Sequence, residues 1–208
     1  MIGTDKSKRL ATRLLRIIER NKDSHPVIKT IHERTTNRAL SFLEAAERWT
    51  IARSLMRKEK KEGLLALKEL KKTARCFVPV LSDLYPHLKI NMSIVNKNTV
   101  DDIFTEIVQL IYNIESETGY GECATSKESI RVLKSCLDAA IEEWKEFENL
   151  QAEVAESSAA LNAERKVFNN ELRIIRRTLA SAIGRTHPDV RRLTLKSSTS
   201  KDTEDPDD

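Results

Sequence analysis

The residues best suited to binding chemistry in this sequence are arginines spaced along helical faces. One set of four recurs at i, i+4, i+7 and i+11, and a set of three recurs at i, i+3 and i+4, so each set lies on one side of a helix. Guanidinium groups bind phosphates and carboxylates through a planar fork of donors. The sequence therefore predicts an anion- or partner-binding surface formed by Arg9, Arg13, Arg16 and Arg20 together with Arg173, Arg176 and Arg177.

A second interpretation of these stripes is an ordinary solvated helix face. No aromatic residue interleaves with the arginines, so base stacking has no platform, and the net charge of +4 is modest. Binding of nucleic acid or of an anionic membrane surface is therefore the alternative function that the arginines leave open.

Catalytic and metal chemistry is not indicated by any motif. The chain has no Glu-x-x-His, its four histidines are scattered, and it has no G-x-S-x-G. The three cysteines show no CxxC spacing, which favours reduced thiols over disulfides or a zinc site. The loop from Thr118 to Cys123 has two glycines but lacks the Lys-Ser/Thr of a phosphate-binding loop. We predict a protein that is not an enzyme and uses no cofactor or metal.

The elements that position the arginines are helices, two of them very long. Between Gly121 and Gly184 there is neither a Gly nor a Pro, so one helix is predicted over about 126–183. Thr125, Ser126 and Glu128 resemble a capping box at its start. Apolar residues recur every seven positions, which is typical of paired helices. The series is Leu133, Ala140, Phe147, Val154, Leu161, Phe168, Ile175 and Ala182.

A second long helix is predicted over about 27–84 from a similar series that includes Phe42, Trp49 and Leu70. Its pattern weakens at residues 57–63, and Pro79 lies near its end, so a bent but continuous helix is favoured over a break. The structural alternative is compact folding through breaks near Gly63 and near Ser157 and Ser158.

Two shorter amphipathic helices are predicted at about 5–22 and 99–118, with Asn98 or Thr99 capping the latter. Only 5% of the residues are aromatic and 33% are charged, as expected of helices rich in surface. The predicted fold is an all-α, elongated antiparallel bundle. It comprises a single domain of residues 1–196 and a disordered acidic tail of residues 197–208.

An antiparallel register in which paired residue numbers sum to about 210 explains the charge distribution. Residues 53–75 hold nine basic and three acidic residues, and residues 99–156 hold four basic and fourteen acidic ones. We expect these regions to neutralise each other and Cys76 to lie near Cys136 as a reduced buried pair. The N-terminal 22 residues and residues 165–196 stay basic and meet at one end, where the tail is able to fold back.

The function that we predict is a non-enzymatic scaffold or protein-interaction module whose partner is protein, either a second copy or another chain. A homodimer would cover the middle of the two long helices, where their seven-residue pattern becomes polar; we call this region the polar centre. An enzyme with a site at that centre is the third interpretation, and its residues would be Arg53, Lys60, Gln151, Ser158 and Arg165. No apolar run reaches the roughly 18 residues of a membrane span, so a cytoplasmic location is expected. A mitochondrial presequence over residues 1–22 is the alternative.

Overall fold

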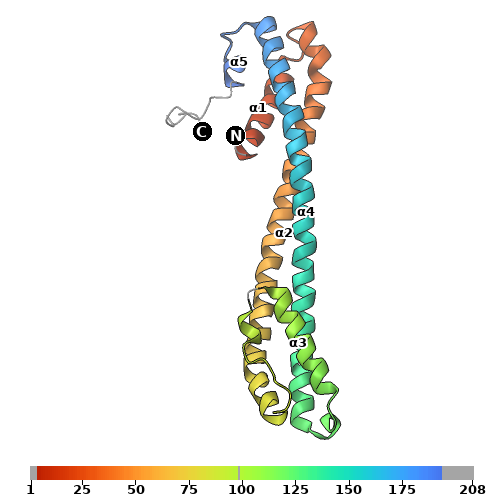
Figure 1. Ribbon diagram of the computed structural model, residues 1–208. Helices are drawn as coiled ribbons and strands as arrows, with labels where there is room; N and C mark the ends of the chain where they lie inside the picture. The colour runs from red at the N-terminus through yellow and green to blue at the C-terminus, as the bar shows by residue number, and fades with distance from the viewer. Residues whose placement is uncertain (1–3, 98, 194–208) are drawn as a thin grey trace. The chain divides into compact units, whose positions relative to one another are not determined.

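The computed structural model describes residues 4–97 and 99–193, and within them every regular element is a helix (Figure 1). The all-α prediction is therefore confirmed. The elements are α1 (Thr4–Asn21), α2 (Pro26–Leu84), η1 (Ile94–Asn96), α3 (Val100–Glu115), η2 (Tyr120–Glu122), α4 (Ala124–Ile183) and α5 (Pro188–Arg192). The predicted tail at 197–208 lies outside the described residues.

The two long helices are continuous through the segments where the sequence pattern weakens. Helix α2 has 59 residues and passes through 57–63, and helix α4 has 60 residues and passes through 151–165. The alternative of helix breaks near Gly63 and near Ser157 is therefore wrong. Gly63 is buried in the middle of α2, where a β-carbon would lie 3.4 Å from Cε3 of Trp144 in α4. The glycine thus allows close helix packing rather than ending the helix.

Helix ends agree with the prediction within three residues, and one of the two predicted caps is confirmed. Thr99 caps α3, because its Oγ1 accepts a hydrogen bond from the backbone N–H of Asp102 at 3.1 Å. The capping box predicted at Thr125 is wrong, since α4 already begins at Ala124. The carbonyl of Cys123 accepts from the backbone N–H of Lys127, and Glu128 pairs with Arg131 instead of turning back to the helix start.

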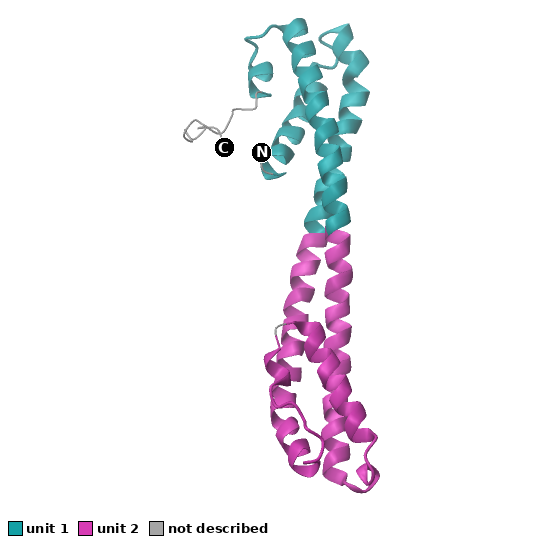
Figure 2. Ribbon diagram, viewed as in Figure 1, with its two compact units in different colours: residues 1–51, 155–208 teal, residues 52–154 magenta. Residues whose placement is uncertain are grey.

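The chain divides into two compact units, unit 1 with residues 1–51 and 155–208 and unit 2 with residues 52–154 (Figure 2). Each unit has its own apolar core. In unit 1 the core joins α1 to the first part of α2, the last part of α4 and α5. In unit 2 it joins α3 and η1 to the remaining parts of α2 and α4. Each short helix thus packs on the long helices within its own unit, and the single domain of residues 1–196 stays a prediction.

Side-chain contacts within each unit confirm the antiparallel register. In unit 1 the ring of Phe42 stacks on that of Phe168. In unit 2 Oγ1 of Thr73 lies 3.5 Å from Sγ of Cys136. These pairs sum to 210 and 209, as predicted. The expected burial of Cys76 against Cys136 is wrong, because Cys76 is exposed and Thr73 takes that position.

Two lysines of the basic run of α2 pair within α2 itself, and the neutralisation of residues 53–75 by residues 99–156 otherwise stays a prediction. Lys58 pairs with Glu59 and Glu62, each at 3.1 Å, and both partners belong to α2 itself. Lys72 pairs with Glu69 one turn away. Intrahelical pairs of this kind contribute little each and need no partner helix. These lysines therefore do not set the register; apolar contacts such as the Phe42–Phe168 stack carry it.

No helix of the described residues combines the length and the apolar character that crossing a membrane requires.

Candidate functional site

The seven predicted arginines are all exposed in unit 1, four on α1 and three on α4. The four on α1 point outward because the opposite face of that helix is buried in the unit 1 core. That buried face is formed by Leu10, Ala11, Leu14, Ile17 and Ile18. Because the apolar face of this amphipathic helix is buried, its charged face must lie toward the solvent.

Helix α5 packs beside the arginine stripe of α1. Nη1 of Arg20 lies 3.5 Å from Oδ1 of Asp189, and Nη1 of Arg13 donates to the backbone carbonyl of Arg192 at 3.4 Å. Asn21 at the end of α1 donates to Oδ2 of Asp189 at 3.0 Å. Two of the four predicted arginines on α1 thus contact α5, which brings Arg191 and Arg192 into the same region.

We name this surface the arginine strip and define it as Arg9, Arg13, Arg16, Arg20, Arg191 and Arg192, all of which are exposed. Within residues 4–97 and 99–193, four of them have no side-chain ion pair or hydrogen bond, namely Arg9, Arg16, Arg191 and Arg192. These four guanidinium groups are therefore available to an external anion.

Two carboxylates near the arginine strip, those of Asp189 and Glu19, already have partners. Asp189 is only 3% exposed and is held by Asn21 and Arg20. Glu19 pairs with Lys22 and accepts from Nε2 of His32 at 2.8 Å. Hydrogen bonds from Lys22 and His32 lower the pKa of Glu19, which keeps it anionic and engaged. Four cations of the strip, those of Arg9, Arg16, Arg191 and Arg192, consequently pair with no acid among residues 4–97 and 99–193.

Arg173, Arg176 and Arg177 do not join this strip through any described contact. They are exposed on the face of α4 opposite Leu172, Ile175 and Leu179, which belong to the unit 1 core. The sequence predicted that both stripes form one surface, and the structure brings only the stripe of α1 to a neighbouring basic segment.

Arg191, Arg192 and Asp189 were not predicted as site residues. The sequence did contain a signal for the start of a helix here, because Pro188 follows His187 and begins a short segment that ends at Leu193. Proline at the first position of a helix is common. The ring Nδ1 of His187 accepts from the backbone N–H of Asp189 at 3.2 Å and caps α5. Five residues are too few for a hydrophobic period, so the docking of α5 could not be predicted.

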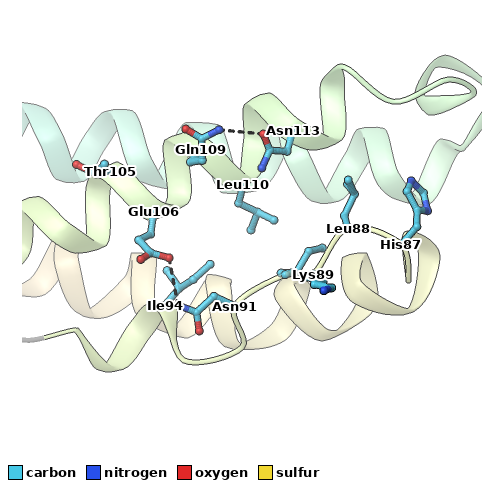
Figure 3. A pocket seen from close by; sticks show the side chains of 11 residues that line it. His87, Leu88, Lys89, Asn91, Ile94, Thr105, Glu106, Gln109, Leu110 and Asn113 are labelled. Atoms are coloured by element: carbon cyan, nitrogen blue, oxygen red, sulfur yellow. Dashed lines mark hydrogen bonds between the residues drawn. The ribbon is translucent and has the colours of Figure 1, made fainter.

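Unit 2 has a groove of about 510 Å³ between the segment after α2 and helix α3 (Figure 3). Its apolar lining comes from Leu88, Ile90, Ile94 and Leu110, and its polar rim includes Gln109 and Asn113. The remaining lining residues are His87, Lys89, Asn91, Thr105 and Glu106.

Several residues that line this groove take part in polar contacts. Glu106 accepts from Nδ2 of Asn91 at 3.2 Å and pairs with Nζ of Lys97 at 2.8 Å. Nε2 of His87 lies 2.9 Å from Oε2 of Glu117. Gln109 donates to Asn113 across one helical turn. Glu106 thus holds the segment after α2 to α3, and His87 holds it to the turn that follows α3.

A cluster of three carboxylates lies between α2 and α4 in unit 2. Oxygens of Glu59, Glu62 and Glu143 are within 4.8 Å of one another. Burial, together with the charges of nearby glutamates, raises the pKa of Glu143. The ammonium of Lys58 already bridges Glu59 and Glu62. The cluster is a point of charge repulsion that Lys58 relieves in part.

The residues of the polar centre lie in different settings within their own units. In unit 2 Gln151 is exposed, and Nζ of Lys60 lies 5.8 Å from the ring centroid of Phe147. In unit 1 Ser158 is half-buried, and Nη2 of Arg165 donates to Oγ1 of Thr4 at 2.7 Å. The enzyme interpretation of these residues stays a prediction.

No protein-family model, curated protein or solved structure matches the chain.

Proposed function

We propose that the chain is a non-enzymatic helical scaffold that binds an acidic protein through the arginine strip of unit 1. The observation that supports this most is that Arg9, Arg16, Arg191 and Arg192 have no side-chain partner among residues 4–97 and 99–193, while Asp189 and Glu19 beside them are already engaged.

The geometry of the strip suits an extended acidic surface. Arg9 and Arg20 are separated by eleven positions on α1, which corresponds to about 16 Å along the helix axis. Carboxylates of a partner helix spaced by three or four residues match arginines with the same spacing. Exposed ion pairs contribute only about 0–1 kcal/mol each, so the strip mainly directs the encounter and sets orientation.

A second copy of the chain is one source of an acidic surface, because residues 99–156 hold fourteen acidic and four basic residues. The strip of one copy and the acidic region of another would form a heterologous contact. Sedimentation velocity at low and high ionic strength distinguishes self-association from binding to a different protein.

Nucleic acid is the second candidate, favoured by the same unpaired arginines. The strip has no aromatic residue, so binding would use the phosphate backbone and weaken steeply with salt. A membrane surface of anionic lipid would respond to salt in a similar way.

The test compares labelled poly-L-glutamate with a short random RNA at low and at physiological ionic strength. We expect poly-L-glutamate to bind more tightly, and the variant R9A/R16A/R191A/R192A to lose about tenfold or more of that affinity. The matched control is R173A/R176A/R177A, which removes exposed arginines of α4. Equal losses in both variants, or no binding at low salt, would contradict the proposal, and a preference for RNA would establish the second candidate.

A further inference from the structure

Three side chains hold α5 in its place on unit 1. Val190 and Leu193 are 4% and 1% exposed and belong to the same core as Leu14 and Ile17 of α1. The carboxylate of Asp189 is bound by Nδ2 of Asn21 and by the guanidinium of Arg20. Asn21 is in turn fixed by donating to the carbonyl of Ile17 at 2.9 Å. The position that α5 occupies is therefore a prepared seat with two apolar subsites and one carboxylate subsite.

Helix α5 has little stability of its own that would keep it in that seat. It has five residues, which is too short to be stable without its contacts. It follows Gly184, whose φ of +94° ends α4 and redirects the chain. Elements with few buried contacts open more readily than the core that surrounds them.

The positive charge of α5 also disfavours its packing beside the arginines of α1. Helix α5 carries Arg191 and Arg192 and contacts Arg13 and Arg20 of the α1 arginine stripe, so like charges lie on neighbouring helices. Another helix with the same buried residues and acidic residues in place of these arginines would keep the seat contacts. It would also form ion pairs with Arg9 and Arg16, which have no side-chain partner among the described residues.

We propose that α5 is an exchangeable, autoinhibitory occupant of a helix-binding seat on unit 1. The partner that displaces it presents a helix with an acidic residue, an aliphatic residue directly after it and a second aliphatic residue three positions further on. This pattern is that of Asp189, Val190 and Leu193, with further acidic residues on the exposed face. The inference rests on the proposed function, since it names the kind of acidic protein that the arginine strip binds.

Displacement of α5 would release two further arginines of the arginine strip. Arg13 loses its acceptor on Arg192, and Arg20 loses Asp189, so both guanidinium groups become available together with Arg9 and Arg16. The seat and the strip then act as one surface, on which apolar residues supply affinity and the arginines supply specificity for acid.

The experiment uses the full chain and a labelled peptide that spans residues 185–193 with R191E and R192E. Fluorescence anisotropy measures binding of the peptide to the natural chain and to its D189A variant, in which α5 loses its carboxylate contacts with Asn21 and Arg20. If α5 fills the seat most of the time, its release raises the apparent affinity of the peptide by about tenfold. The matched control is the same peptide carrying D189A, for which we expect a loss of binding to both chains.

Hydrogen exchange of the amides of residues 189–193 in the full chain reports whether α5 leaves its seat. We expect their protection to fall in D189A and, in the natural chain, on addition of the peptide. A second variant, L193D, tests release without altering the carboxylate subsite. Equal peptide affinity for all three chains, or no loss of protection in either variant, would overturn the inference. The proposed function is tested separately with poly-L-glutamate, so either idea can fail alone.

Discussion

The ring of Phe42 in α2 stacks on the ring of Phe168 in α4, with centroids 4.9 Å apart and an angle of 12° between the ring planes. Both side chains are completely buried in unit 1. Each belongs to the seven-residue series of its own helix, and their numbers sum to 210, so this contact fixes the register of the long helices in that unit.

Replacing either ring with a small side chain should strongly destabilise unit 1. We expect Phe42→Ala or Phe168→Ala to lower the free energy of unfolding by about 3–5 kcal/mol, because each leaves a cavity in a packed core. Chemical denaturation followed by circular dichroism measures the loss. In the double variant the two losses should differ from additivity by about 0.5–1.5 kcal/mol, the usual value for an aromatic pair. Simple additivity would show that the rings do not interact.

The stability of the protein with a buried carboxylate at Glu171 should depend on Arg34. Oε1 of Glu171 accepts from Nε of Arg34 at 3.0 Å and from Oγ1 of Thr35 at 3.2 Å, it lies 2.9 Å from Nη2 of Arg34, and the Glu171 side chain is 9% exposed. We expect Arg34→Ala to cost about 1–3 kcal/mol of unfolding free energy, since it removes a charged hydrogen-bond donor from a buried acid.

Arg48 provides the control for this variant, because it also pairs with a glutamate but both side chains are mainly exposed. Arg48→Ala should change the unfolding free energy by less than about 1 kcal/mol. If denaturation curves show the same shift for both arginine variants, burial of Glu171 is not what makes its ion pair important.

Gly63 offers a position where a larger residue should stabilise the protein, but only if it is alanine. A β-carbon there lies 3.4 Å from Cε3 of Trp144, which is ordinary contact, and alanine favours the helix over glycine by about 1 kcal/mol. Gly63→Ala should therefore raise the melting temperature, while Gly63→Leu should lower it through a clash with Trp144 and the backbone of Glu143. A stabilising leucine would show that α2 and α4 are not closely packed here.

Removal of the Glu143 charge should stabilise unit 2 at neutral pH and not in acid. Its pKa is raised above the ordinary value of 4.5 by burial and by Glu146, Glu62 and Glu59. The folded chain therefore holds this proton more tightly than the unfolded chain, and stability is lost as the pH rises from 4.5 through the raised pKa.

Glu143→Gln should accordingly raise the melting temperature at pH 7, and the gain should vanish below about pH 4, where the natural carboxyl is protonated in both states. Thermal unfolding at several pH values measures the effect. Glu153→Gln, on an exposed position of the same helix, is the control. A gain that is independent of pH would mean that charge repulsion at Glu143 is not its cause.

The sequence alone determined the helices and the way in which the long pair meets. The absence of Gly and Pro between Gly121 and Gly184 and the seven-residue series predicted α4 to within two residues. The same series placed Phe42 opposite Phe168. Such predictions work because the positions that face a partner helix are set by the helical period itself, which is a local property.

Only the tertiary structure decided which arginines gain neighbours and how the candidate site is built. Arg13 and Arg20 contact α5 while Arg173 and its neighbours do not, and Asp189 is buried against Asn21, 168 positions away. The groove of unit 2 likewise forms where the segment after α2 meets α3. A five-residue helix and an irregular segment have no period from which their contacts could be deduced, so their positions depend on the packing of the assembled core.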